Sequence, residues 1–528
     1  PGWAATPEAL PAADRVASLL EVTKAHWQDA MKGSARISVP DPMLTNLIAA
    51  SRVHCMLAAR NEDGERIEPW IASTYYGPLE SEAHSIIRGM QFLGHDDFAR
   101  RGLEFFVRQY NERGYLTTGY TLIGTGWHLW ALGEYYALNK DSEWLTGVAP
   151  EVSRVCRWIM AQRKKTMLAK DATQRPPDYG LMPPGVLADW SVYSHYFYLN
   201  GNYYAGLKSA GEALADIGQD EADEILKEAA IFRGDIERAF HYVQAQAPVL
   251  PLRDGTWALP YPTQLYAPIP TEELYADGDD MGRTWAYDVE LGAHHLVPMG
   301  VLDAADPSVT AMINHMEDVQ FLKSGWLYYP EADNRADWFN FGGFAKVQPF
   351  YARNAEVYAA RDDMKPFIRS YFNATASLVN REDLSLWEHF FNGAFNKTHE
   401  TGYFLYQSRL MLIMERGRSL WLAPFVPAQW MEDGKAIEVQ DAPTLFGTTG
   451  FSIASHVKEG RIAATINPPT RQAPDAIVIR LRHPGGIPIQ RVEVNGAKQH
   501  SVSPVDSTVH IIPDGKVITL TAYYGGAE

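Results

Sequence analysis

Residues 124–132 read GTGWHLWAL, and residues 220–228 read DEADEILKE. The first stretch is apolar or small all round, which is typical of a buried helix. The second stretch carries charge on one face, which is typical of an outer, solvated helix. Segments of these two kinds alternate along the chain between residue 41 and about residue 416. This alternation predicts an inner layer and an outer layer of helices.

The alternation predicts six helical hairpins. The outer members are expected at 41–59, 98–112, 143–165, 219–243, 306–318 and 365–380. The inner members, rich in Gly, Ala, Trp and Tyr, are expected at 82–93, 121–138, 190–215, 282–297, 343–360 and 399–415. Six outer and six inner helices in strict alternation describe an (α/α)6 toroid, so the fold class is mainly α.

The pattern changes to short strands after residue 416. Turn signals such as Asn495-Gly496 and Asp514-Gly515 separate runs such as 476–481. Short strands at regular spacing favour a β-sandwich. We therefore expect a linker helix in 1–37, a catalytic toroid in 38–416 and a C-terminal β-sandwich domain in 417–528. The chain begins at Pro1 without Met, and we expect it to be part of a longer polypeptide or a processed form.

The connections of the toroid differ in length. Inner-to-outer connections are short, whereas outer-to-inner connections are long, at about 60–81, 113–120, 166–189, 244–281, 319–342 and 381–398. Long loops in a compact domain usually carry function. All six must emerge at one end, because the inner helices all run the same way. That end is the candidate active site.

Five of these loops combine aromatic residues with acids, which is what sugar binding needs: rings stack on apolar sugar faces, and carboxylates bind hydroxyls. The expected substrate-binding residues are Trp70, Tyr75, Tyr76, Glu80, Glu82, Trp190, Trp257, Asp280, Arg283, Trp326, Glu331, Asp337, Trp338, Trp387 and His389.

Cleavage of a glycosidic bond needs two carboxyl groups, one as a general acid and one as a base or nucleophile. Asp189-Trp190 and Trp387-Glu388 each place an acid beside Trp, which helps to desolvate it. These pairs come from the third and sixth loops, which face each other across a six-fold ring. We therefore expect Asp189 and Glu388 to be the catalytic pair of a glycoside hydrolase acting on an oligo- or polysaccharide or a glycoside.

The chain resembles the six-hairpin glycosidase superfamily, which includes α-L-rhamnosidases, glucoamylases and trehalases. The resemblance covers roughly residues 10–525 and rests on Gly180-Leu181-Met182-Pro183-Pro184 with Asp189-Trp190, on Leu386-Trp387-Glu388, and on the 420–430 exit strand. It implies that Glu388 is the base, as in α-L-rhamnosidases, and that the third hairpin supplies the acid, as in glucoamylases.

The resemblance also implies inversion of the anomeric centre, and an N-terminal β-domain that precedes this chain. The sequence departs from the α-L-rhamnosidases before the first inner helix, where their catalytic acid lies in an acid-rich motif. Here Tyr75 occupies that region, and Glu82 matches the acid at the helix start. This departure puts rhamnosidase specificity in doubt.

Structural interpretations compete with these roles. Asp189 could cap a helix that begins at Trp190, and Glu82 could answer the helix dipole; Glu80 and Glu331 are reserve candidates for the acid. Asp277, Asp279 and Asp280 lack the spacing of a calcium loop, so a solvated or substrate-binding loop is favoured. We expect no metal site and no cofactor, and interpret His84, His128 and His195 as core histidines.

Bulk properties narrow the function further. The net charge of −17 argues against a nucleic acid partner, and no apolar run is long enough to span a bilayer. The two cysteines, Cys55 and Cys156, lie on apolar helix faces and are interpreted as buried thiols. The enzyme class slightly favours an extracellular or periplasmic location.

Three other functions fit the same barrel. A polysaccharide lyase would use Arg283 and Arg335 with Tyr261 or Tyr266, although the loop acids would repel a uronate. A sugar phosphorylase would need a phosphate site in place of the base. The third is a carbohydrate-binding protein without catalysis.

Overall fold

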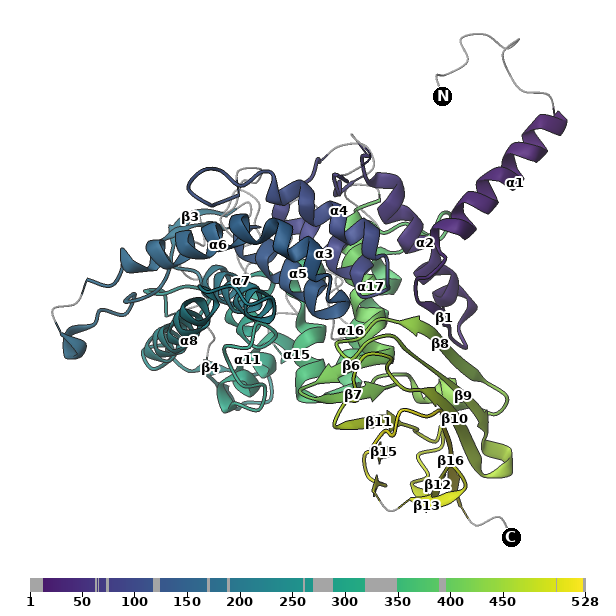
Figure 1. Ribbon diagram of the computed structural model, residues 1–528. Helices are drawn as coiled ribbons and strands as arrows, with labels where there is room; N and C mark the ends of the chain where they lie inside the picture. The colour runs from purple at the N-terminus through teal and green to yellow at the C-terminus, as the bar shows by residue number, and fades with distance from the viewer. Residues whose placement is uncertain are drawn as a thin grey trace.

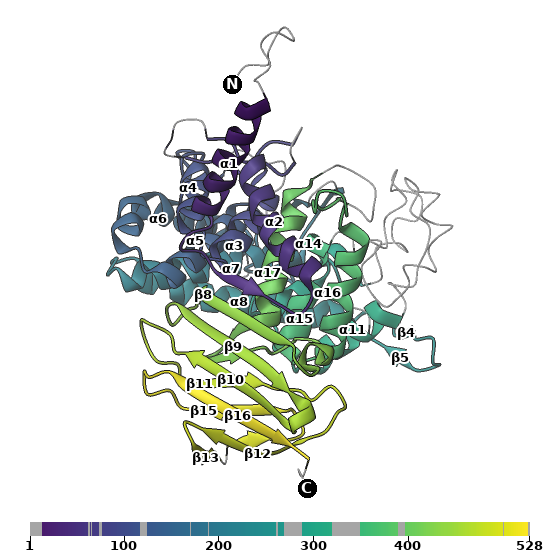
Figure 2. The same cartoon turned by 90° about the vertical axis from the view of Figure 1, so that its right-hand side faces the viewer.

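The computed structural model describes residues 13–525, except 62–63, 65, 73–75, 117–123, 169–170, 188–189, 260–261, 269–287, 319–348, 389–395 and 500. The fold class is the predicted one, because a toroid of helical hairpins is followed by a β-sandwich (Figure 1). Figure 2 shows the sandwich lying against one end of the toroid.

The outer layer of the toroid follows the prediction closely. Each helix packs an apolar face towards the inner layer, as α8 shows with buried Ile225, Phe232 and Phe240. The outer helices are α2 (Pro42–Ala58), α4 (Asp96–Val107), α6 (Ser142–Lys164), α8 (Ala222–Gln244), α11 (Pro307–Asp318) and α16 (Met364–Leu378).

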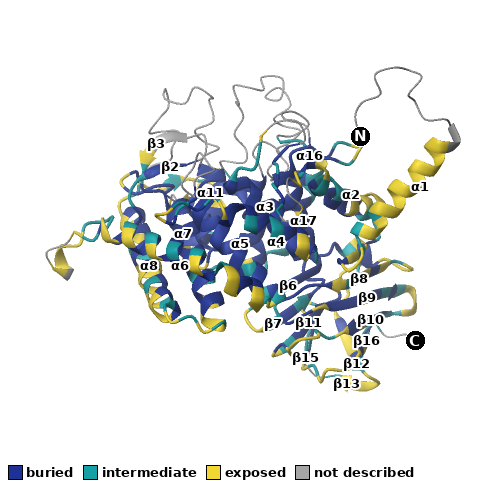
Figure 3. Ribbon diagram, turned by 45° about the horizontal axis from the view of Figure 1, so that its top comes forward, coloured by how far each residue is buried: buried dark blue, intermediate teal, exposed yellow. Residues whose placement is uncertain are grey.

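The inner layer forms a closed ring. Contacts run from α3 to α5 and α7, then through η3 and α15 to α17, which packs back on α3. Helices α3, α5, α7 and α17 are mostly dark blue, hence buried, in Figure 3. The inner segments are α3 (Glu80–Gln91), α5 (Gly124–Asn139), α7 (Phe197–Asp216), η3 (Ala293–Leu296), α14 (Pro349–Ala352), α15 (Asn354–Arg361) and α17 (Thr398–Leu412).

Glycine allows the inner helices to approach closely. A Cβ atom on Gly89 of α3 would lie 2.2 Å from the carbonyl oxygen of Gly402 in α17. A Cβ atom on Gly126 of α5 would lie 2.6 Å from the backbone of Asn202 in α7. No side chain fits at such distances, so the glycine content that predicted an inner layer has a packing cause.

Three inner segments differ from the prediction. The helix expected at 190–215 begins at Phe197, because Trp190–Ser194 forms strand β3 paired with β2 (Gly185–Leu187). The capping interpretation of Asp189 required a helix start at Trp190 and is wrong. Of the helix expected at 282–297, only 288–290 and the 3-10 turn η3 are helical among the described residues. Here the His295 side chain donates through Nε2 to the backbone carbonyl of Glu290 at 2.7 Å.

The helix expected at 343–360 is interrupted. Between α14 and α15, Arg353 adopts a left-handed backbone with φ of 45°. Its Nε lies 2.6 Å from Glu356 Oε1, and its guanidinium lies over Trp130. The break therefore directs a buried arginine into the middle of the ring.

The C-terminal domain consists of two sheets. The larger has the order β1 (Arg36–Ser38), β8 (Ala436–Ala442), β9 (Thr449–His456), β10 (Arg461–Asn467), β16 (Ile518–Tyr524), β12 (Ile489–Val494) and β13 (Ala497–Gln499). The smaller has the order β14 (Val502–Ser503), β15 (Thr508–Ile511), β11 (Ala476–Arg480), β7 (Ser419–Leu422) and β6 (Ile413–Arg416).

The N-terminal segment reaches both parts of the molecule. Helix α1 (Ala13–Ala30) projects away from the body in Figure 1, whereas β1 pairs antiparallel with β8 of the sandwich, a strand that sequence analysis did not identify. Between toroid and sandwich, Arg480 of β11 pairs with Asp362 at 2.6 Å. None of the described helices has the length and hydropathy that a membrane crossing requires.

Candidate active site

Carboxylates gather where the long loops enter the inner helices. Glu80 and Glu82 lie in the first turn of α3, and Glu400 lies in the first turn of α17. Glu388 precedes α17, and Glu290 lies in the helical turn 288–290. We call this set the acid-rich end of the toroid.

Glu388, the predicted base, forms an ion pair. Lys397 Nζ lies 2.9 Å from Glu388 Oε1, and the lysine side chain is 2% exposed, compared with 18% for the glutamate. The ammonium also lies 3.9 Å from the centroid of the Tyr76 ring. Glu388 therefore faces the open side of the site, with the lysine behind it.

The backbone around this pair joins the first and sixth loops. Lys397 forms an antiparallel bridge with Ala72, and the Thr398 N–H donates to the carbonyl of Ile71 at 3.1 Å. The Thr398 hydroxyl donates to the carbonyl of Trp70 at 2.5 Å. These bonds fix the start of α17 beside the loop that precedes α3.

Glu82 is a buried carboxyl with a raised pKa. Burial raises its pKa to about 7, against an opposing effect of the Lys397 charge and of a hydrogen bond from Ser81. The negative charges of Glu80 and Glu388 raise this pKa further. Glu82 also lies in the first turn of α3, where a carboxylate can interact with the helix dipole, so the structural interpretation of this residue stays open.

Glu400 is a second buried carboxyl with a raised pKa, and sequence analysis missed it. Burial raises its pKa well above the ordinary value, and the charges of Glu388 and Glu290 act in the same direction. The N–H of Phe350 donates to Glu400 Oε2 at 3.1 Å. The sequence offered one signal for Glu400: it is an acid in the first turn of a predicted inner helix, as Glu82 is in α3.

The other predicted residues are placed as follows. The Glu80 side chain is buried against α5, where a Cβ on Gly124 would lie 1.6 Å from its Cγ. Trp70 stacks under Arg60, Trp387 is half-buried, and Trp257 of β5 (Trp257–Ala258) is 65% exposed. The residues that lie outside the described ones are Tyr75, Asp189, Tyr261, Asp277, Asp279, Asp280, Arg283, Trp326, Glu331, Arg335, Asp337, Trp338 and His389.

The three histidines lie in the interior, as expected. The ring of His84 stacks on Trp127, His128 hydrogen-bonds the carbonyl of Leu103, and His195 hydrogen-bonds that of Met182. Within the described part of the chain no group of His, Cys, Asp and Glu could hold a metal ion. The two thiols, Cys55 and Cys156, are free and buried.

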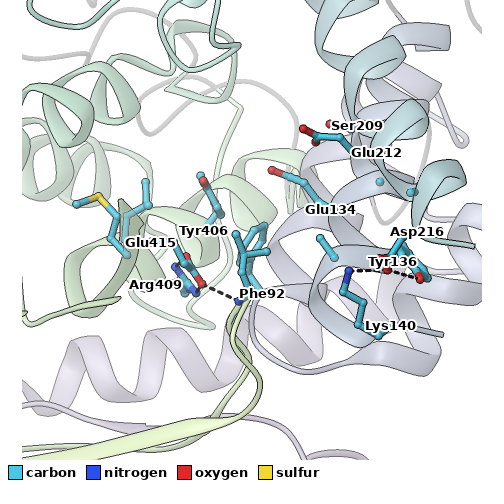
Figure 4. A pocket seen from close by; sticks show the side chains of 16 residues that line it. Phe92, Glu134, Tyr136, Lys140, Ser209, Glu212, Asp216, Tyr406, Arg409 and Glu415 are labelled. Carbon is cyan, nitrogen blue, oxygen red and sulfur yellow. Dashed lines mark hydrogen bonds and ion pairs between the residues drawn. The ribbon is translucent and has the colours of Figure 1, made fainter. Parts of the chain in front are cut away.

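The opposite end of the toroid contains a cavity of about 350 Å³ beside the sandwich (Figure 4). Carboxylates line it too, but these pair with cations: Asp216 with Lys140 at 2.9 Å, and Glu415 with Arg409 at 2.5 Å. Glu134 pairs with Arg88 at 2.7 Å. Because these charges compensate one another, we assign the candidate active site to the acid-rich end.

Comparison with solved structures supports the fold. The structure of α-L-rhamnosidase from Dictyoglumus thermophilum aligns with a TM-score of 0.52 at 10% identity, over 93% of this chain and 50% of that chain. At this identity the similarity shows a shared fold. This chain spans half the length of that rhamnosidase.

Other similarities are more distant. A bacterial glucoamylase complexed with acarbose aligns with a TM-score of 0.43 at 12% identity, over 71% of this chain and 57% of that chain. A structure described as a glycoside hydrolase aligns with a TM-score of 0.44 at 11% identity, over 92% of this chain and 77% of that chain. No family model matches the sequence, and no curated protein matches it.

Proposed function

We propose that the protein is a glycoside hydrolase whose acid-rich end cleaves a glycosidic bond by acid/base catalysis. The observation that carries this proposal is the contrast between two neighbouring carboxyls. Glu388 is paired with an ammonium and partly open to solvent, whereas Glu82 is buried with its pKa raised to about 7. A charged and a protonated carboxyl are the two partners that glycoside hydrolysis needs.

In this mechanism Glu82 donates its proton to the glycosidic oxygen as the bond to the anomeric carbon breaks. Glu388 accepts a proton from a water molecule, whose oxygen bonds to that carbon from the opposite face. The anomeric configuration is then inverted. Glu400 also has a raised pKa, but it is 1% exposed and accepts a backbone hydrogen bond, so we assign it a structural role.

Asp189 remains the acid that the sequence predicts, and it lies outside the described residues. Glu82 and Glu400 both have a raised pKa and both feel the charge of Glu388. We propose Glu82 because its side chain keeps more exposure, 5% against 1% for Glu400. Substrate-binding roles for the loop aromatics, a carbohydrate partner and an N-terminal β-domain of the same polypeptide remain part of this proposal.

The test uses aryl glycosides and oligosaccharides with the wild type and Glu388→Gln. We expect hydrolysis by the wild type and a fall in kcat of about 10²–10⁴-fold in the variant, the usual contribution of a general base. Proton NMR of the first-formed sugar reports the anomer. Glu212→Gln, at the opposite end and paired with Lys208 at 2.6 Å, is the matched control and should keep wild-type rates.

Other outcomes identify the alternatives. An unsaturated, ultraviolet-absorbing product would indicate a lyase, and turnover that depends on phosphate would indicate a phosphorylase. Sugar binding without turnover in the wild type would indicate a non-catalytic binding protein. Equal hydrolysis by the wild type and Glu388→Gln would refute the role of Glu388.

A further inference from the structure

Arg52 of α2 differs from the other buried arginines of the described chain. It is 7% exposed, and no carboxylate of the described residues forms an ion pair with it. Burial lowers its pKa to about 10, so the side chain keeps its charge at neutral pH. A buried charge without a partner is costly. The other buried arginines each pair with a carboxylate: Arg88 with Glu134, Arg163 with Asp235, Arg353 with Glu356, Arg409 with Glu415 and Arg480 with Asp362.

One nitrogen of the Arg52 guanidinium holds the backbone. Nη1 donates to the carbonyl of Ala35 at 2.7 Å and to Ser34 Oγ at 3.3 Å. Nε is fully buried and has no hydrogen-bond partner among the described residues. Nη2 has no partner there either, but it is not fully buried. The edge formed by Nε and Nη2 is therefore unused, although arginine binds carboxylate and phosphate oxygens through such paired N–H groups.

Arg52 lines an open groove of about 490 Å³. The groove lies between the end of α1, the connection from α1 to β1, and β8 of the sandwich, and its charged lining residues are Lys32, Arg36, Arg52 and Asp441. Asp441 pairs with Arg36 at 2.9 Å. Lys32 pairs with Asp29 at 2.7 Å. Among the described residues, Arg52 is thus the cation of this groove that lacks a counter-charge.

The groove is separate from the acid-rich end. The Ala35 N–H donates to the carbonyl of Leu93 at 2.8 Å, and Leu93 lies just beyond the C-terminal end of α3. Glu82 lies in the first turn of the same helix, which has 12 residues and therefore a length of about 18 Å. The groove lies near the other end of α3 and is not part of the candidate active site.

We propose that this groove binds an oxyanion, a phosphate or a carboxylate group, through the Arg52 guanidinium. An oxygen of the anion accepts from Nη2 and supplies the counter-charge, while Lys32 and Arg36 at the rim add positive potential. The net charge of −17 repels anions from most of the surface, so binding here requires a local site. This inference is independent of the proposed hydrolase function.

The test is isothermal titration calorimetry of the full chain with inorganic phosphate and, separately, with acetate. Sodium chloride keeps the ionic strength constant, so that general screening does not change. We expect saturable binding of at least one of the two anions, with a Kd of about 1 mM or lower. Arg52→Met should weaken that binding by about tenfold or more. Binding of phosphate alone assigns a phosphate group, and binding of acetate alone assigns a carboxylate.

A second variant covers the case in which Arg52→Met does not fold, because Nη1 also holds the backbone. Arg36→Gln changes a side chain that is 67% exposed and leaves Asp441 unpaired beside the groove. We expect it to weaken anion binding by about threefold or more, since a rim cation is lost. Arg418→Gln is the matched control: this arginine is 73% exposed and pairs with Asp475 at 3.0 Å. It should bind the anion as the wild type does.

Failure of the wild type to bind either anion saturably would overturn the proposal. Equal affinities of the wild type and Arg36→Gln, with equal affinity of any folded Arg52→Met, would do the same. Weaker binding in Arg36→Gln but not in Arg418→Gln would place the anion in the groove even if Arg52→Met does not fold. A lower melting temperature of Arg52→Met with unchanged anion affinity would show that Arg52 only holds the backbone at Ala35.

Discussion

Two glutamates of the inner helices are similarly buried, yet their pKa values are shifted in opposite directions. Glu356 of α15 is 6% exposed and Glu82 of α3 is 5% exposed. Burial raises the pKa of both, but Arg353 and Arg88 reverse the effect at Glu356, whose pKa is lowered overall. At Glu82 the effect of burial outweighs the charge of Lys397, and the pKa is raised to about 7.

The difference lies in the supply of cations. Glu356 accepts from Arg353 Nε at 2.6 Å and from Arg88 Nη1 at 3.1 Å. Arg88 also pairs with Glu134, so the middle of the ring is a compensated network. A compensated buried network organises a fold, whereas uncompensated buried carboxyls with raised pKa values are typical of functional sites.

The largest effect on stability should come from breaking the ion-pair network around Glu356. Glu356→Ala leaves two buried arginines short of a partner, and we expect a loss of about 3–5 kcal/mol in the free energy of unfolding. Urea denaturation measures it. A loss below about 1 kcal/mol would show that the network is more solvated than its burial indicates.

A smaller, pH-dependent effect should come from Glu82→Gln. Because the folded pKa, about 7, exceeds the ordinary 4.5, the unfolded chain releases this proton first as the pH rises. Wild-type stability should therefore fall between about pH 4.5 and pH 7, at a total cost of about 3 kcal/mol. The variant lacks this titration. Its free energy of unfolding, relative to that of the wild type, should therefore rise by that amount between about pH 4 and pH 8. A constant difference would mean that Glu82 titrates normally.

The smallest effect should come from Lys140→Met. Its ion pair with Asp216 is partly exposed, at 38% and 49%, and such pairs contribute about 0–1 kcal/mol. Denaturation in low and high salt would show how far salt reduces this small contribution to the free energy of unfolding. A loss of several kcal/mol would mean that the cavity end is as sensitive to charge as the centre of the ring.

Much of the fold could be predicted because helix periodicity and loop length are local signals. Outer helices α2 and α16 lie within two residues of the predicted ranges. The inner segments were less predictable where tertiary contacts override periodicity. The helix expected at 343–360 is interrupted at Arg353, whose side chain forms an ion pair with Glu356. Residues 190–194, expected to be helical, pair as a strand.

Less of the site could be predicted. A Trp-Glu pair in a long loop indicated Glu388, but nothing local links it with Lys397 or Glu82. These residues meet because α17 closes the ring against α3, a contact between the first and sixth hairpins. Glu400 was missed for the same reason, since a first-turn acid is an ordinary feature of a helix until its burial is known.

The most direct test of the account is how the hydrolysis rate of the Glu82→Gln variant depends on the leaving group of the substrate. Rates would be compared on a glycosyl fluoride, whose departure needs little protonation, and on an aryl glycoside with a poor leaving group. We predict a fall of about 10²-fold or more on the poor leaving group and a near wild-type rate on the fluoride. Equal rates with the wild type on both substrates would contradict the account, and the same signature in Asp189→Asn instead would give the role of acid to Asp189.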